Sequence, residues 1–178
     1  MSPRVNPGRV MTFAHSDNQP LGPDMKPRLN YAKVAPGVYE AMDALDQYLA
    51  GCSLDETMLH LARLRASQLN GCAYCIDMHW KDLRELGETE QRLYSLDAWR
   101  ECPYYTERER AVLAWTEAVT LVTAGHVADA VHDEVRRVLT EREVADLTLA
   151  VAAINAWNRL SISARLVPGT YQPAAARA

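Results

Sequence analysis

Residues 65–79 read RASQLNGCAYCIDMH, and this stretch says most about the fold. An Asn-Gly pair interrupts a helical pattern just before the first cysteine, so Cys72 is predicted to begin a new helix. On that helix Cys72, Cys75 and His79 follow the i, i+3, i+7 spacing and share one face. The free N–H groups of a helix N-terminus favour negative charge, which lowers the pKa of a thiol and raises its thiolate fraction. The stretch therefore predicts a helical scaffold that carries reactive thiols.

The composition indicates one domain with a substantial core. The chain has 178 residues, of which 48% are hydrophobic, and it is short for two ordinary domains. A net charge of −4 without a basic run argues against a nucleic-acid partner. The longest apolar stretch, residues 144–157, contains polar interruptions and does not predict a membrane span.

The cysteine content and the N-terminal residues predict a reducing compartment. The four cysteines do not form the dense pattern of a secreted disulfide scaffold, and the first residues contain no signal-peptide core. We therefore expect a cytoplasmic protein. In that compartment a CxxC pair is catalytic or metal-binding more often than structural.

Apolar spacing and capping residues predict an all-α domain of about seven helices. The predicted helices cover about 36–51, 54–69, 72–87, 90–99, 106–125, 128–139 and 140–166. Capping boxes begin at Thr106 and Thr140. No window shows sustained alternation with period two, so no sheet is expected.

This helical domain is predicted to extend over residues 29–171. Residues 1–28 contain several prolines and few apolar residues, which predicts an extended or disordered extension, and residues 172–178 form a short tail. The last helix is apolar on more than one face, as in helices that are buried both in the monomer and against another subunit. We therefore expect a homo-oligomer, whether dimer, trimer or hexamer.

Several chemistries compete for Cys72, Cys75 and His79. A structural zinc site usually has four ligands, and the chain lacks a second CxxC or HxxxH pair. A c-type haem site needs histidine directly after the second cysteine, where Ile76 stands. A thioredoxin-like CxxC follows a strand, whereas the flanks here are helical. A dithiol redox site without metal or cofactor is the favoured interpretation, and metal binding and inert thiols are the alternatives.

The cysteine stretch closely resembles the core of the carboxymuconolactone decarboxylase and alkylhydroperoxidase D-like family. Residues 109–111, Glu-Arg-Ala, and residues 155–159, Asn-Ala-Trp-Asn-Arg, look like later signatures of that family. The resemblance covers about residues 29–171. It implies an all-helical homo-oligomer with CxxC-dependent peroxidase activity, which requires a hydroperoxide substrate and an external dithiol reductant.

The resemblance also implies catalytic roles. It suggests Cys75 as the peroxidatic cysteine, Cys72 as the resolving cysteine and His79 as part of a proton relay. The relay usually includes a glutamate twelve residues before the first cysteine, where this chain has His60. An imidazole can pass protons near neutral pH but cannot supply the fixed charge of a carboxylate. His60 is therefore either a relay residue or a partly buried helix residue without catalytic duty.

Tyr74 and Trp157 are weaker candidates, for substrate contact. Tyr74 stands between the cysteines and Trp157 lies in the later signature, and packing is the competing interpretation for both. Two functions compete with the peroxidase. One is lactone decarboxylation, which needs no dithiol, so the intact CxxC argues against it. The other is a non-enzymatic oligomer that senses redox state or binds zinc.

Overall fold

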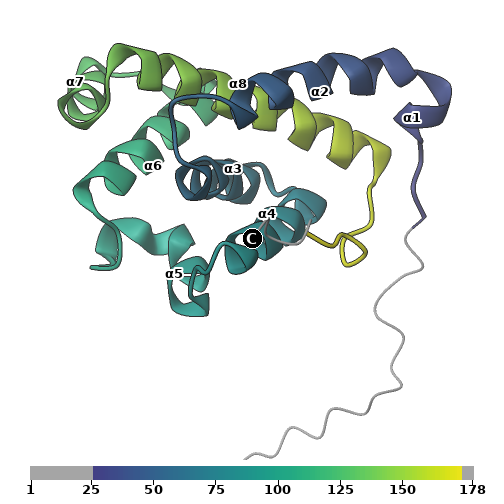
Figure 1. Ribbon diagram of the computed structural model, residues 1–178, viewed down its shortest axis with the longest axis horizontal. Helices are drawn as coiled ribbons and strands as arrows, with labels where there is room; N and C mark the ends of the chain where they lie inside the picture. The colour runs from purple at the N-terminus through teal and green to yellow at the C-terminus, as the bar shows by residue number, and fades with distance from the viewer. Residues whose placement is uncertain (1–25, 174–178) are drawn as a thin grey trace, which may run out of the picture.

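The computed structural model describes residues 26–173, and every element within this range is helical (Figure 1). The elements are α1 (Tyr31–Val34), α2 (Pro36–Ala50), α3 (Glu56–Asn70), α4 (Ala73–Glu85), α5 (Glu90–Tyr94), η1 (Leu96–Glu101), α6 (Glu107–Thr120), η2 (Val122–Ala124), α7 (Asp129–Val138) and α8 (Glu141–Ala164). The predicted extension (1–28) and tail (172–178) lie largely outside the described residues, and the domain boundaries stay predictions.

The seven predicted helices correspond to α2 through α8, which confirms the all-α prediction. The predicted helix at 90–99 is divided, because the chain continues beyond α5 as the 3-10 helix η1. Leu93, Leu96 and Trp99 are all buried. This three-residue repeat of buried side chains suits the period of a 3-10 helix better than that of an α-helix.

Capping residues determine where the helices around the cysteines begin and end. Asp55 caps α3 by accepting a hydrogen bond from a backbone N–H of the first turn. Gly71 ends α3 with a φ of 68°, a left-handed conformation that glycine adopts without strain. Cys72 follows directly as the N-cap of α4, so the predicted position of the CxxC at a helix start is confirmed. The capping boxes predicted at Thr106 and Thr140 are both formed.

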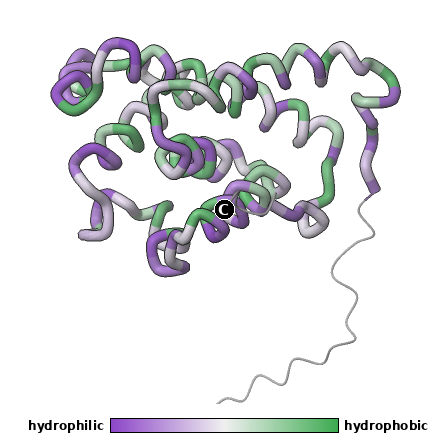
Figure 2. Tube along the Cα trace, viewed as in Figure 1, coloured by the Kyte–Doolittle hydropathy of each residue, from purple (hydrophilic) through white to green (hydrophobic). Residues whose placement is uncertain are grey.

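Helix α3 lies at the centre of the molecule, where it packs against α4, α6 and α8 (Figure 1). Its Leu59 belongs to a hydrophobic cluster shared with α6 and α8, and its Leu61 and Leu64 belong to a second cluster shared with α4, α5 and η1. Figure 2 shows apolar and polar residues alternating in short stretches along the helices, as expected of amphipathic helices around a common core. The start of α4 packs between Ala66 of α3 and Ile154 of α8.

Helix α8 is buried along much of its 24 residues. Leu147, Val151 and Ile154 are at most 2% exposed, whereas Ile162 is 47% exposed. The monomer thus buries most of the apolar faces that suggested an oligomer, and the homo-oligomer stays a prediction. Within residues 26–173, no helix combines the length and the apolar character needed to cross a membrane.

Candidate active site

The two cysteines of the CxxC motif lie at the N-terminus of α4 and form a disulfide. Their Cα atoms are 5.3 Å apart, and each residue is 1% exposed. The backbone N–H of Cys75 donates to Sγ of Cys72 at 3.4 Å. Helix N-termini and such N–H groups stabilise negative charge on sulfur, so this position favours a thiolate on Cys72 once the disulfide is reduced.

The two candidate histidines meet beside α4. His79 lies one turn after Cys75 on α4, and His60 projects from α3. Their Nδ1 atoms are 3.1 Å apart and both side chains are buried. The packing of α3 on α4 therefore brings the two histidines into contact, although they are 19 positions apart in sequence.

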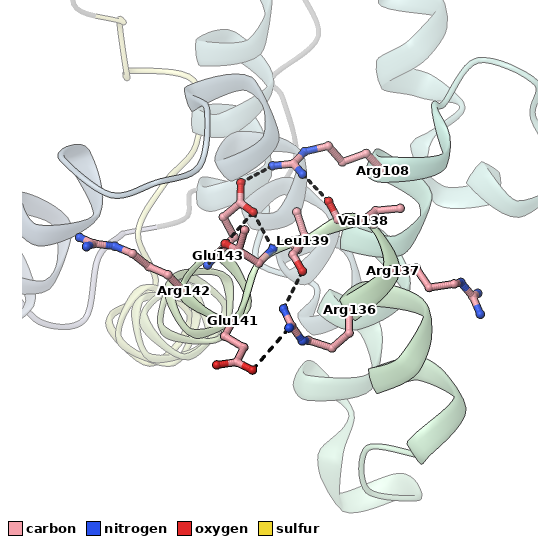
Figure 3. A pocket seen from close by; sticks show the side chains of 9 residues that line it. Arg108, Arg136, Arg137, Val138, Leu139, Glu141, Arg142 and Glu143 are labelled. Atoms are coloured by element: carbon pink, nitrogen blue, oxygen red, sulfur yellow. Dashed lines mark hydrogen bonds and ion pairs between the residues drawn. The ribbon is translucent and has the colours of Figure 1, made fainter.

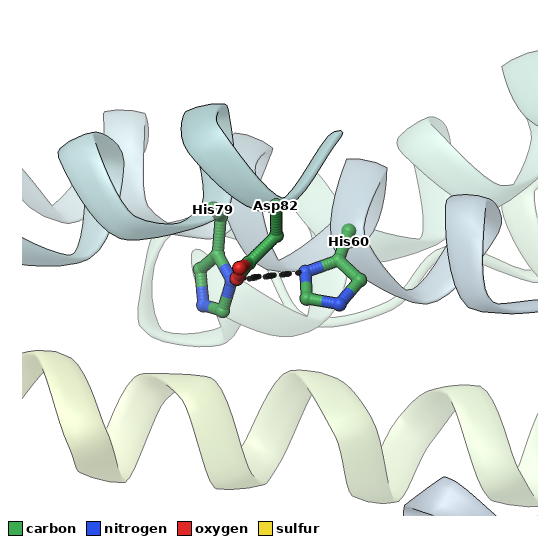
Figure 4. Close-up of side chains that lie close together, drawn as sticks. All are labelled: His60, His79 and Asp82. Carbon is green, nitrogen blue, oxygen red and sulfur yellow. Dashed lines mark hydrogen bonds and ion pairs between the residues drawn. The ribbon is translucent and has the colours of Figure 1, made fainter. Parts of the chain in front are cut away.

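Asp82 joins the histidines, and sequence reasoning missed it. Its Oδ2 lies 3.5 Å from Nδ1 of His60 and 3.5 Å from Nδ1 of His79 (Figure 4). Its other oxygen accepts a hydrogen bond of 2.6 Å from the hydroxyl of Tyr171. Asp82 follows His79 by three residues on the same helix, and this i, i+3 spacing is a signal that could have revealed it. Tyr171, beyond the last helix, had no local signal.

Burial and the surrounding charges determine the protonation of this cluster. Burial, together with His79 and Arg63, lowers the pKa of His60 to about 3. Burial also lowers the pKa of His79. Burial alone would raise the pKa of Asp82, but its contacts with His79 and Tyr171 bring the pKa below its ordinary value. Near neutral pH, two neutral imidazoles therefore face one ionised carboxylate.

Among the described residues, one buried ring nitrogen of this cluster has no hydrogen-bond partner. Nε2 of His79 is buried and makes no hydrogen bond to any of them. The other ring nitrogen of His79 faces His60 and Asp82. A histidine held through Nδ1 by a carboxylate presents Nε2 as a proton acceptor, which is the arrangement of a general base beside a nucleophile.

A cavity of about 290 Å³ adjoins the cluster. Its lining includes both histidines and Asp82 but neither cysteine. Tyr74, Ile154 and Trp157 line the cavity and also pack against the two cysteines, so they form the wall between the cavity and the disulfide. Both weak candidates for substrate contact, Tyr74 and Trp157, are therefore at the cavity.

The indole of Trp157 is held in place from α2. Its Nε1 donates to Oδ2 of Asp46 at 2.8 Å, and its ring packs edge to face on Tyr39 with 5.3 Å between the centroids. Asp46 also lies 3.5 Å from the guanidinium of Arg63. All four residues line the cavity. Helix α2 thus supplies part of the cavity lining and holds Trp157 in place.

The later signature at residues 155–159 has a positioning role in the structure. Nδ2 of Asn70 donates to the side-chain oxygens of Asn155, at 3.0 Å, and Asn158, at 2.9 Å. Nδ2 of Asn158 in turn donates to Oγ of Ser67 at 3.0 Å. These bonds attach the end of α3, just before Cys72, to α8. Asn155 and Asn158 do not line the cavity, so their role in this structure is to pack α8 against α3.

A larger cavity, of about 670 Å³, lies at the joint between α7 and α8 (Figure 3). Its arginines are largely engaged in local pairing: Arg108 bonds Glu143 and the Val138 carbonyl, and Arg136 pairs with Glu141. The lining contains no cysteine or histidine. These ion pairs connect helices, and the lining offers no nucleophile, so the smaller cavity beside α4 is the candidate active site.

Comparisons with known proteins agree with this geometry. The family model described as the carboxymuconolactone decarboxylase family matches residues 36–118. The uncharacterized protein YdfG of Bacillus subtilis (strain 168) is 42% identical over 139 residues, which are 78% of this chain and 95% of YdfG.

Solved structures show the same fold. A protein of unknown function from Agrobacterium tumefaciens, for which an AhpD-type role in antioxidant defence has been suggested, is 40% identical with a TM-score of 0.79, covering 82% of this chain and 100% of that one. A peroxidase-related protein from Ralstonia eutropha JMP134 with an alkylhydroperoxidase AhpD core is 19% identical with a TM-score of 0.68, covering 76% of this chain and 73% of that one. The second likeness concerns the fold alone.

Proposed function

Because this chain belongs to the carboxymuconolactone decarboxylase family, we propose that it is a thiol-dependent peroxidase of the alkylhydroperoxidase type. The observation that carries the proposal is the Cys72–Cys75 disulfide at the start of α4, one helical turn from a buried His79. The suggested antioxidant role of the Agrobacterium relative supports it. Two adjacent cysteines that alternate between dithiol and disulfide supply the two electrons that reduce a peroxide bond.

Cys75 is the proposed nucleophile. It precedes His79 by four residues on α4, a spacing at which two helical side chains can meet. In the reduced enzyme, Nε2 of His79 takes the proton of the Cys75 thiol, while Asp82 and His60 hold the imidazole through Nδ1. The thiolate attacks the peroxide, the O–O bond breaks, and the products are a Cys75 sulfenic acid and an alkoxide, which the relay protonates to the alcohol.

Cys72 is the proposed resolving cysteine. Its thiolate attacks the sulfur of the sulfenic acid, the S–O bond breaks, and protonated hydroxide leaves as water. An external dithiol then reduces the disulfide and becomes oxidised itself. The net reaction converts one hydroperoxide and one dithiol into an alcohol, a water molecule and a disulfide. The N–H of Cys75 that bonds Sγ of Cys72 stabilises the Cys72 thiolate both as attacking group and as leaving group.

The test is peroxide consumption with a dithiol donor, in variants of each cysteine. Cys75→Ser is expected to abolish turnover. Cys72→Ser is expected to lose turnover but to accumulate a Cys75 sulfenic acid, which dimedone traps and mass spectrometry detects. Cys102→Ser is the matched control, because Cys102 is a free cysteine of intermediate exposure outside the motif, and it is expected to keep the parent rate.

Two results would contradict the proposal. One is full turnover in Cys75→Ser. The other is an equal loss in both motif variants without any trapped sulfenic acid in Cys72→Ser, since the assigned roles require that intermediate. Either result would leave the fold and the family unchanged and would remove the dithiol cycle.

A further inference from the structure

Three atoms of the kind that bind metal ions face one another where α3 packs on α4: Nδ1 of His60, Nδ1 of His79 and Oδ2 of Asp82 (Figure 4). We propose that they bind one divalent first-row transition-metal ion of the Zn²⁺ class. The proposal goes beyond the peroxidase cycle, because it requires neither cysteine as a ligand.

The spacing of the three atoms fits a single ion. The two nitrogens are 3.1 Å apart, and the carboxylate oxygen is 3.5 Å from each nitrogen. Nitrogen and oxygen ligands bind Zn²⁺ at about 2.0–2.2 Å, and two ligands of a tetrahedral ion at that distance lie roughly 3.3–3.6 Å apart. The three atoms therefore already form a triangle close to one face of such a tetrahedron.

The ligand set and its burial suit a borderline metal ion. Two imidazoles and one carboxylate are a recurring three-residue set for Zn²⁺ and for non-haem Fe²⁺. The side chains of His60, His79 and Asp82 are 11%, 6% and 14% exposed. Burial favours neutral imidazoles, which have a free lone pair for the ion, and the ion in turn compensates a carboxylate held away from water.

Neighbouring residues would orient the ligands. Tyr171 donates its hydroxyl to Oδ1 of Asp82, which leaves Oδ2 for the ion. Oε1 of Glu56 lies 3.9 Å from Nε2 of His60, on the side where a metal-bound histidine usually donates its remaining N–H to a carboxylate. All three ligand residues line the cavity of about 290 Å³, so a fourth coordination position opens onto space for water or a small ligand.

The site differs from a zinc site built on the CxxC motif. Cys72 and Cys75 are bonded to each other, neither lines the cavity, and His79 directs Nδ1 toward His60 and Asp82. The two uses of His79 also require opposite tautomers. A base that accepts a proton at Nε2 carries its hydrogen on Nδ1, whereas a ligand that binds through Nδ1 carries it on Nε2. Metal-bound and proton-accepting His79 are therefore alternative states of one residue.

The experiment titrates Zn²⁺ into the metal-free, full-length, oxidised protein by calorimetry, with Co²⁺ absorption as a second readout of the ligand set. We expect one ion per chain. His60→Gln and Asp82→Asn are each expected to weaken binding by more than tenfold, and Tyr171→Phe by about tenfold, as for loss of an outer hydrogen-bond partner. His132→Gln is the control, because His132 is an exposed histidine with Asp133 at 3.7 Å, and it is expected to bind as the parent does.

The Cys72→Ser/Cys75→Ser double variant separates this proposal from the thiol chemistry, and it is expected to keep the site and lose peroxidase turnover. Circular dichroism of each metal-free variant checks that the variant is folded. If a variant is unfolded, the Co²⁺ absorption spectrum of the parent protein still tests the ligand set. The proposal is overturned by absence of stoichiometric binding, by parent-like binding in folded His60→Gln and Asp82→Asn, or by a sulfur-to-cobalt charge-transfer band. Peroxide consumption by the parent protein in the presence of a metal chelator tests the proposed peroxidase activity independently of the metal site.

Discussion

Asp82 contacts both histidines of the site through one oxygen and Tyr171 through the other. A single carboxylate can therefore orient two imidazoles, and Nε2 of His79 has no hydrogen-bond partner among the described residues. The substitution of the family glutamate by His60 does not remove negative charge from the cluster, because Asp82, one turn after His79, supplies it. This arrangement favours a relay role for His60, a role that remains a proposal.

Tyr74 is predicted to restrict substrate size, because it forms part of the wall between the cavity and the disulfide. Tyr74→Ala shortens the side chain by the whole ring and opens this wall. We expect kcat/KM for cumene hydroperoxide to rise several-fold relative to that for hydrogen peroxide, measured by steady-state peroxide consumption. Tyr94→Ala is the control, since Tyr94 on α5 is 65% exposed and does not line the cavity. An unchanged ratio in Tyr74→Ala would assign substrate entry to another wall.

At the scale of elements, the asparagine contacts attach the end of α3, just before the CxxC, to α8. Asn158 is fully buried, donates to Ser67 and accepts from Asn70. Asn158→Ala removes the acceptor of one hydrogen bond from Asn70 and the donor of the hydrogen bond to Ser67. The variant is expected to have a free energy of unfolding lower by about 1–3 kcal/mol. Urea denaturation measures the change. Arg159→Ala, at the next and exposed position, is expected to change it by less than about 0.5 kcal/mol.

A second set of contacts connects α3, η1 and α6 through Glu117. Its carboxylate accepts hydrogen bonds from Arg65 on α3 and from Trp99 and Arg100 on η1. Burial opposes ionisation, but these three donors hold the pKa of Glu117 below its ordinary value of 4.5. A carboxyl group whose pKa is lowered by folding stabilises the folded state above its unfolded pKa, and this contribution is lost as the pH falls through the folded value.

Glu117→Gln removes this contribution. The free energy of unfolding of the variant is expected to be lower than that of the parent at pH 7, with a difference that stays constant down to about pH 5. Below about pH 4.5 the difference is expected to shrink, since the parent carboxylate becomes protonated as well. Denaturation curves collected from pH 3 to pH 7 measure both the difference in the free energy of unfolding at pH 7 and its decrease at low pH. A difference that does not depend on pH would show that the ionised state of Glu117 is not what stabilises the contacts.

At the scale of the whole molecule, the site combines segments from the two ends of the described chain. Helix α2 supplies Tyr39 and Asp46, α3 and α4 supply the histidines, α8 supplies Trp157, and the segment after α8 supplies Tyr171. The cavity therefore forms only when α2 and α8 pack on α3 and α4. A shorter chain that lacked either end would lose one of its walls.

The homo-oligomer is a prediction for the molecule as a whole. Helix α8 still exposes Ile162, and Tyr39 beside the cavity is 37% exposed. Burial of such apolar surface against another copy would be favourable, at roughly 25 cal/mol per Å². Sedimentation equilibrium is expected to give a multiple of the 19.9 kDa chain mass, and a single species of 19.9 kDa would contradict the prediction.

Local patterns were sufficient to predict the helices and the start of α4. Three of the predicted features depend on hydrogen bonds or side chains at most a few residues apart. They are the capping boxes at Thr106 and Thr140, the break at Gly71, and the spacing of Cys72, Cys75 and His79. Such interactions leave a readable periodicity in the chain. They made the scaffold and the reactive pair predictable, but not the division of the helix at 90–99, which follows from how Leu93, Leu96 and Trp99 pack.

Packing in three dimensions was needed for the partners of these residues. The pairing of His60 with His79, the hydrogen bond from Tyr171 to Asp82 and the attachment of Trp157 to α2 all join residues far apart in sequence. Their distances depend on how α2, α3, α4 and α8 pack together, and no local periodicity encodes those relative positions. The thiols could therefore be recognised from the chain. The buried cluster of His60, His79 and Asp82, which we propose activates the thiols and binds a metal ion, exists only once the helices have packed.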